Sequence, residues 1–295
     1  MRLDEPSDPR AELLAARAEI QRLRETIGGL ELWIDQVQEA QAILDRNAQL
    51  EQEMAIASRI QTSILPRRLA VAGLEIAARM QPAQLIGGDY YDLIPTDDGC
   101  WIGIGDVSGH GVTAGLVMLM TQAVVAAVGR ACPHASPAEL VPLVNDVLYE
   151  NVRGRLRIRD FVTFSLLRYR GDGSLTYAGA HEIALIVRAS GEPELLPVTG
   201  TWLAQRPDVR DVTIDSHAQL GPGDLLVLYT DGITEARDTT GDQLGFDRLV
   251  DTIVAARDAP VEDVCAAILA TAAAWAPAQE DDRTIIAARQ TPYGA

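Results

Sequence analysis

The stretch W-I-G-I-G-D-V-S-G-H-G, residues 101–111, determines our interpretation of the fold. Its first seven residues, 101–107, form a short apolar run that predicts a β-strand, and Asp106 lies at the end of this run. Glycines on both sides of Asp106 give the backbone freedom where a main chain must approach a ligand closely. The stretch therefore predicts a strand that ends in a carboxylate.

Aspartates also begin or end other apolar runs. The further segments are G-G-D-Y-Y-D (87–92), L-L-V-L-Y-T-D-G (225–232) and E-D-D-R-T (280–284). Any one of these aspartates, taken singly, suits a turn or a helix cap. Several carboxylates that converge at one sheet edge repel one another unless a cation neutralises them, and oxygen ligands suit Mg²⁺ or Mn²⁺. The joint pattern predicts a divalent-metal site.

From about residue 70 the chain consists of short apolar runs separated by glycine, aspartate and proline. Candidate strands cover 74–80, 88–94, 101–107, 161–169, 174–178, 183–188, 212–217, 224–230 and 284–289. Helical periodicity covers 114–129, 137–151, 246–256 and 261–274. Because strands and helices do not alternate regularly, a doubly wound parallel sheet is disfavoured. We predict an α+β fold built on an antiparallel β-sandwich.

Nearer the N-terminus, hydrophobic residues recur at alternating steps of three and four, which is typical of a coiled-coil seam. The seam includes Ile20, Leu23, Ile27, Leu30 and Ile34. Isoleucine at the a positions with leucine at d favours two parallel strands, so these residues predict dimerisation and a homodimer. The alternative is an amphipathic helix packed on its own domain, because adjacent glycines interrupt the seam and weaken the helix.

Three segments are expected along the chain. Residues 1–10 are polar and are predicted to be disordered. Residues 11–66 are predicted to form a helical coiled coil or regulatory linker, and residues 67–292 the main domain.

Composition excludes several classes of function. The 295 residues are 47% hydrophobic, enough for a sizeable core, and carry 25 basic against 42 acidic side chains, a formal net charge of −17. This charge disfavours nucleic acid as a partner. All the basic side chains are arginines, which excludes lysine-based chemistry and a P-loop. Because no membrane span or signal peptide is recognisable, we expect a cytoplasmic protein.

Several motifs occur in an order that resembles the SpoIIE/RsbU family of bacterial serine phosphatases, a branch of the metal-dependent, protein phosphatase 2C-like fold. The motifs are A-S-R-I-Q-T-S-I-L-P (57–66), G-G-D-Y-Y-D-L (87–93), I-G-D-V-S-G-H-G (104–111), L-Y-T-D-G-I-T-E-A-R (228–237) and D-D-R-T (281–284). The resemblance implies an antiparallel β-sandwich flanked by helices on both sides. It also implies that two ions, Mn²⁺ or Mg²⁺, bind at one end of the sandwich.

The resemblance assigns roles to five residues. It implies that Asp106 bridges the two ions, that the carbonyl of Val107 contacts one of them, and that Asp231 and Asp281 complete the site. Asp89 corresponds to an acidic residue at the metal edge that often acts through water. The catalytic set is thus Asp106, Asp231 and Asp281, and its chemistry is attack of an activated water on a phosphomonoester.

The chain departs from the family pattern in three places. The segment 177–183 lacks the usual asparagines, segment 200–204 lacks a leucine-glycine pair, and Arg283 replaces an aliphatic residue. Arg283 is a candidate for contact with substrate phosphate, although pairing with a neighbouring carboxylate is favoured. His110 is expected to have a structural or a phosphate-proximal role rather than to donate a proton.

Two functional hypotheses remain open. In the first, the chain is a phosphoserine or phosphothreonine protein phosphatase that acts on a phosphorylated STAS-type antagonist of an anti-sigma factor. An upstream activator protein would regulate it through the N-terminal helix. In the second, it is a catalytically silent phosphoprotein-docking module that the coiled coil dimerises.

Overall fold

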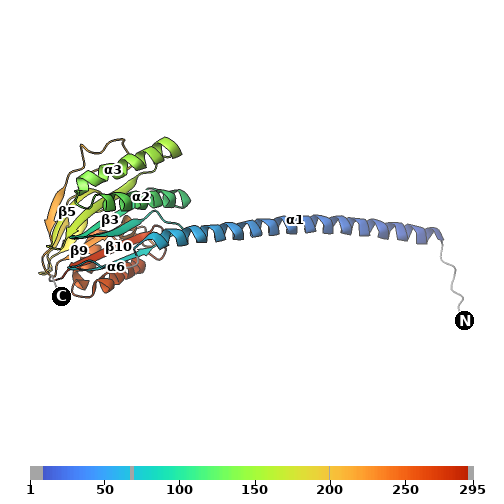
Figure 1. Ribbon diagram of the computed structural model, residues 1–295. Helices are drawn as coiled ribbons and strands as arrows, with labels where there is room; N and C mark the ends of the chain where they lie inside the picture. The colour runs from blue at the N-terminus through green and yellow to red at the C-terminus, as the bar shows by residue number, and fades with distance from the viewer. Residues whose placement is uncertain (1–8, 67–69, 199, 292–295) are drawn as a thin grey trace. The chain divides into compact units, whose positions relative to one another are not determined.

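The computed structural model describes residues 9–66, 70–198 and 200–291 (Figure 1). The chain divides into two compact units, residues 1–56 and residues 57–295. Of the span 1–10 predicted to be disordered, residues 1–8 lie outside the described residues, and Pro9 and Arg10 begin a helix.

Helix α1 (Pro9–Ile64) supplies the described part of the first unit and continues into the second. It runs without a break through Gly28 and Gly29. Glutamine side chains donate to carboxylates one turn further on, as in Gln21–Glu25 at 3.0 Å, and such pairs stabilise an exposed helix slightly. The five seam residues Ile20, Leu23, Ile27, Leu30 and Ile34 are 46–54% exposed. The coiled coil and the homodimer stay predictions.

Two five-stranded antiparallel sheets form the centre of the second unit. The first sheet has the order β1 (Leu74–Gln81), β10 (Arg283–Gln290), β9 (Leu225–Tyr229), β6 (Ala184–Val187), β7 (Pro193–Leu196). The second has the order β2 (Tyr90–Thr96), β3 (Gly99–Val107), β4 (Val162–Arg170), β5 (Ser174–Ala180), β8 (Ser216–Gln219). The predicted antiparallel sandwich is confirmed.

Helices cover both outer faces of the sandwich (Figure 1). Helices α2 (Val112–Ala131) and α3 (Pro137–Tyr149) pack on the sheet that contains β3, and α3 continues as the π-helical segment η1 (Glu150–Leu156). Helix α6 (Val261–Trp275) packs on β1 and β10, with α5 (Phe246–Ala256) beside it. The short helix α4 (Asp231–Thr234) follows β9. The expected helices on both sides are therefore present.

The core follows the two-residue period of the strands. In β9, Leu226 and Leu228 belong to the cluster between the sheets, whereas Val227 and Tyr229 belong to the cluster under α5 and α6. A strand buried on both faces reads as a continuous apolar run, which is why the sequence reveals it so clearly.

Two strand predictions need correction. The strand expected at 212–217 is shorter and later, because Val212 and Thr213 are held in a turn by hydrogen bonds from their N–H groups to the Val209 carbonyl, at 3.2 and 3.0 Å. Strand β7 was not predicted, since three of its four residues are exposed and it begins with a proline, as edge strands tolerate.

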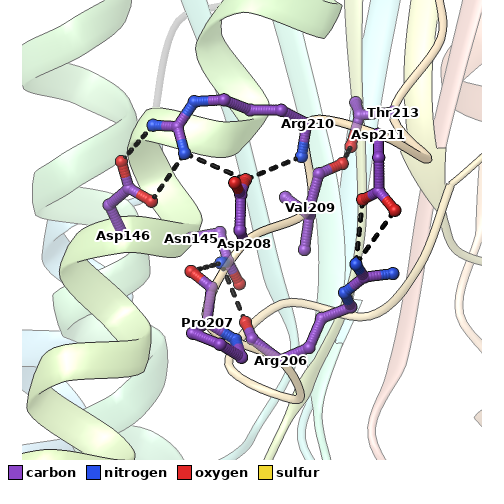
Figure 2. Close-up of polar contacts among 9 residues, drawn as sticks. All are labelled: Asn145, Asp146, Arg206, Pro207, Asp208, Val209, Arg210, Asp211 and Thr213. Carbon is purple, nitrogen blue, oxygen red and sulfur yellow. Dashed lines mark hydrogen bonds and ion pairs between the residues drawn. The ribbon is translucent and has the colours of Figure 1, made fainter.

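The connection before β8 is anchored on α3 by the buried Asn145. Its Nδ2 donates to the carbonyls of Arg206 and Pro207 at 3.1 and 3.3 Å, and its Oδ1 accepts from Ala204 N–H at 2.9 Å. Figure 2 shows the two hydrogen bonds that Asn145 donates, beside an exposed ion pair between Arg210 and Asp146. Both sets of contacts join the connection to the same helix.

Among the described residues, α2 alone is long and apolar enough to pass a length and composition test for a membrane-crossing helix. Its residues Ala114, Val117, Met118 and Val125 are buried in the core cluster, and the helix packs on β2 and β3. We therefore assign α2 to the core of the domain. The cytoplasmic location stays a prediction.

Candidate metal centre

The aspartates singled out in the sequence gather at one end of the sandwich because of the antiparallel pairing. Asp106 lies near the end of β3, next to the start of β2, where Tyr90 pairs with Gly105. Asp231 lies two residues after the end of β9, next to the start of β10, where Thr230 N–H donates to the Thr284 carbonyl at 3.1 Å. Antiparallel neighbours place the end of one strand beside the start of the next.

Asp89 joins the two sheets at this end. Its carboxylate is 2% exposed and accepts hydrogen bonds from the hydroxyls of Thr230 and Thr284, at 2.9 and 2.6 Å. Burial, together with the charges of Asp282 and Asp231, raises the pKa of Asp89 well above its ordinary value, against the effect of these hydrogen bonds. Asp89 is thus buried more deeply than Asp106, Asp231 and Asp281, and it is held by Thr230 just after β9 and by Thr284 in β10.

Asp106 is affected by the charges of four neighbouring aspartates. Burial raises its pKa to about 9, and the charges of Asp89, Asp231, Asp281 and Asp282 raise it in the same direction. Burial and the charge of Asp281 raise the pKa of Asp231 to about 6. The sequence-based expectation that the carboxylates converge and disfavour one another's ionised form therefore agrees with the structure.

Asp282 was not assigned a role from the sequence, although it lies beside Asp281. Its carboxylate accepts from the backbone N–H groups of Ala83 and Gly88, at 2.7 and 2.8 Å. A Cβ added at Gly87 would lie 2.0 Å from Asp282 Oδ2, so any other residue there would displace the Asp282 carboxylate. Asp282 therefore holds the glycine loop in place, and the paired aspartates of the D-D-R-T motif were its only signal in the sequence.

Gly88 brings the loop against the strand that carries Asp106. A Cβ at this position would lie 2.9 Å from the Val107 carbonyl oxygen and 3.0 Å from Asp106 Oδ1. The Val107 N–H donates to the Gly88 carbonyl at 3.3 Å, and the Val107 side chain is fully buried. The Val107 carbonyl is thus next to the acidic group, where the resemblance placed it.

The two candidates for phosphate contact differ in environment. His110 is exposed and its Nδ1 lies 3.3 Å from Gln84 Nε2. Its proximity acts to lower the pKa of Asp281, against the larger effect of burial, which raises it. Arg283 is 3% exposed and donates from Nε to the Gly232 carbonyl at 3.3 Å. It lines a cavity of about 120 Å³ together with Asp281. The favoured carboxylate pairing of Arg283 is not present among the described residues, in which its polar partner is a backbone carbonyl.

The donor set fits a hard divalent cation, since it consists of carboxylates and one carbonyl. Asp106, Asp231 and Asp281, with the Val107 carbonyl, are the groups that would hold such an ion. Within residues 9–66, 70–198 and 200–291, however, no three His, Cys, Asp or Glu side chains lie close enough to form a ready ligand set.

Solved structures share this fold. The SiaA-PP2C domain of Pseudomonas aeruginosa superposes with a TM-score of 0.72 and 24% sequence identity, over 82% of this chain and 98% of that domain. The catalytic domain of the serine/threonine protein phosphatase PstP, in complex with two manganese ions, gives a TM-score of 0.55 and 12% identity, over 76% of this chain and all of that one. The domain thus has the protein phosphatase 2C fold.

The family follows from the sequence comparison. The family described as Stage II sporulation protein E (SpoIIE) matches residues 96–291, and the chain belongs to this family. Phosphoserine phosphatase RsbU of Bacillus subtilis (strain 168) is 29% identical over 208 residues, which are 69% of this chain and 60% of RsbU. Protein IcfG of Synechocystis sp. is 29% identical over 248 residues, 76% of this chain. The chain spans only 60% and 38% of the lengths of these two relatives.

Proposed function

We propose that this chain is a metal-dependent phosphoserine and phosphothreonine protein phosphatase. The observation that carries the proposal is the position of Asp106, whose pKa is raised to about 9 by burial and by four neighbouring aspartates at one end of the sandwich. Membership of the SpoIIE family and the similarity to a phosphoserine phosphatase support it. We place the activity in residues 67–292.

Each residue has a part in the proposed reaction. Asp106, Asp231 and Asp281 bind two ions, Mn²⁺ or Mg²⁺, with the carbonyl of Val107 as a further ligand. When bound, these ions supply Lewis acidity that acidifies water and neutralises charge on the phosphoryl group. Asp89, held by two threonine hydroxyls, lies at the metal edge and would act on the ions through water.

The phosphate of the substrate would bind beside Asp281, at the edge of the group of aspartates. His110 is exposed beside Asp281, and Arg283 lines the adjoining cavity, so both are placed to orient a phosphate as it approaches. Water then attacks phosphorus and gives up a proton, while the bond between phosphorus and the serine or threonine oxygen breaks. That oxygen takes up a proton from solvent, so the products are inorganic phosphate and the free hydroxyl.

The proposed substrate is a phosphorylated STAS-type protein in a partner-switching pathway, as the family resemblance implies. Residues 11–66 would dimerise the chain and transmit the signal of an upstream activator protein to the phosphatase domain. The competing proposal is a catalytically silent docking module. The presence of Asp106, Asp231 and Asp281 argues against that alternative.

Hydrolysis of p-nitrophenyl phosphate with added Mn²⁺ separates the two proposals. We expect turnover by the full chain, loss of turnover in Asp106→Ala, and normal turnover in Asp251→Ala, which removes an exposed aspartate on α5. If the unmodified chain hydrolyses neither this ester nor a phosphoserine protein with Mn²⁺ or Mg²⁺, the docking module is the better description.

A further inference from the structure

A chain of hydrogen bonds crosses from one sheet to the other beneath the acidic group. His181 Nδ1 lies 2.9 Å from Thr163 Oγ1, and His181 Nε2 lies 2.9 Å from the Tyr229 carbonyl oxygen. The Thr163 hydroxyl oxygen in turn accepts from the Asp106 backbone N–H at 3.2 Å. The imidazole therefore links the backbone at Asp106 to the backbone at Tyr229.

The partners determine where the protons lie. A carbonyl oxygen can only accept, so His181 Nε2 must carry the hydrogen that it donates to Tyr229. In the neutral ring, Nδ1 is then an acceptor. The single hydrogen of the Thr163 hydroxyl has two acceptors within reach, His181 Nδ1 at 2.9 Å and the Asp106 carbonyl at 3.2 Å, and the shorter contact with Nδ1 takes it. Burial agrees with a neutral ring, since it lowers the pKa of His181 to about 4.

The linked residues lie directly beside proposed metal ligands on two different sheets. Thr163 in β4 is the pairing partner of Asp106 in β3. Tyr229 is the last residue of β9 and precedes Asp231 by two residues. His181 follows β5, so a residue on neither ligand-bearing strand connects both.

We propose that His181 is a positioning residue that sets the separation of Asp106 and Asp231 for binding a divalent cation. The proposal rests on the proposed metal-dependent function. Loss of the ring would leave the Thr163 hydroxyl and the Tyr229 carbonyl without this partner in a half-buried place, which is costly, and would free the two strand ends to move apart. Groups that orient metal ligands in this way typically change metal affinity by about 10- to 100-fold when removed.

The test is Mn²⁺ binding by titration calorimetry on the full chain. We expect His181→Phe and Thr163→Val each to weaken Mn²⁺ binding by about 10-fold, and Thr163→Ser, which keeps the hydroxyl, to bind as the unmodified chain does. His181 and Thr163 belong to the same series of hydrogen bonds. The double variant should therefore bind Mn²⁺ only slightly more weakly than either single variant.

The same sheet offers a matched control. Thr176 Oγ1 in β5 and His217 Nδ1 in β8 lie 3.3 Å apart. This is also a threonine–histidine contact, but it involves no strand that bears a proposed metal ligand. His217→Phe and Thr176→Val should leave Mn²⁺ affinity unchanged. Thermal unfolding without metal shows whether each variant is folded. If His181→Phe does not fold, Thr163→Val is used to test the proposal.

The outcomes are distinguishable. Folded variants of His181 and Thr163 that bind Mn²⁺ within twofold of the unmodified chain overturn the positioning proposal while leaving the proposed function intact. An unmodified chain that binds neither Mn²⁺ nor Mg²⁺ overturns both. Equal weakening by the His217 and His181 variants assigns the effect to general loss of sheet stability and also overturns the positioning role.

Discussion

The side-chain amide of Gln61 forms two hydrogen bonds with the backbone of Gly87. Its Nε2 donates to the Gly87 carbonyl at 2.6 Å, and its Oε1 accepts from the Gly87 N–H at 3.2 Å. Gln61 is 5% exposed and belongs to the last turns of α1, within the unit that contains the sandwich. Gly87 immediately precedes Gly88 and Asp89, so the motif at 57–66 holds the glycine loop opposite Asp282.

Gln61→Ala should therefore lower both stability and activity. It leaves the buried N–H and carbonyl of Gly87 without partners. Each buried polar group that loses its hydrogen bond costs about 1–3 kcal/mol of stability. We expect a lower midpoint in urea unfolding and weaker phosphatase activity at limiting Mn²⁺. Thr62→Ala, which removes an exposed hydroxyl bonded within its own helix, is the control and should change neither quantity appreciably.

Replacing a proposed metal ligand should affect activity far more than folding. Asp106→Asn or Asp231→Asn should reduce phosphatase activity by at least about 10²-fold, because each removes a charged ligand from a two-ion site. Initial rates at saturating Mn²⁺ measure the effect. Near-normal rates in both variants would exclude these residues from the catalytic machinery.

The raised pKa of Asp106 also predicts how the metal-free protein responds to pH. Its folded-state pKa of about 9 lies above the unfolded value of about 4, so the folded chain holds a proton that the unfolded chain releases. Stability should consequently fall as pH rises between these values, by at most about 1.4 kcal/mol per pH unit from this group. Urea unfolding at pH 6 and pH 8 in a chelator measures the slope.

Asp106→Asn is the control for that slope. The amide cannot ionise, so the variant should lose part of the pH dependence and be more stable than the unmodified chain at pH 8 without metal. Added Mn²⁺ should reverse the order, because the cation stabilises the ionised carboxylates of the unmodified chain. An identical slope in both proteins would contradict the assignment of the raised pKa to Asp106.

The sequence revealed the parts of this site that are local and concealed those that depend on contacts between sheets. Asp106 and Asp231 were recognisable because each terminates a buried apolar run, and such runs are visible without tertiary information. The Thr163–His181–Tyr229 bridge was not, because it joins β4, β5 and β9 across the sandwich. Strand β7 was concealed for a different reason: an exposed edge strand has no apolar run to reveal it.

The anchor between α3 and the connection before β8 provides a test of stability away from the site. Asn145→Ala should destabilise the domain by about 1–3 kcal/mol, since it removes three hydrogen bonds from a fully buried position. Asp146→Ala removes only the exposed pair with Arg210, and surface pairs contribute about 0–1 kcal/mol. Urea unfolding should therefore separate the two neighbouring variants, and equal losses would contradict the anchor.

The last prediction concerns the exposed seam of α1. Ile27 and Ile34 are 53% and 46% exposed, and burying such side chains against a second helix is favourable by about 25 cal/mol per Å² of apolar surface removed from water. Ile27→Glu/Ile34→Glu should convert the expected dimer to a monomer, because it places charges where a parallel pair would meet. Light scattering of the full chain measures the mass directly.

A charge-matched variant separates loss of the seam from added charge alone. Gln36→Glu/Ala42→Glu adds the same two charges at positions outside the a and d pattern, so it should stay dimeric. Comparing phosphatase activity of the two variants then tests regulation, since gating through the helix requires that the monomer differ in activity from the dimer. A seam variant that remains a dimer, or a monomer with unchanged activity, would leave α1 without the regulatory role proposed for it.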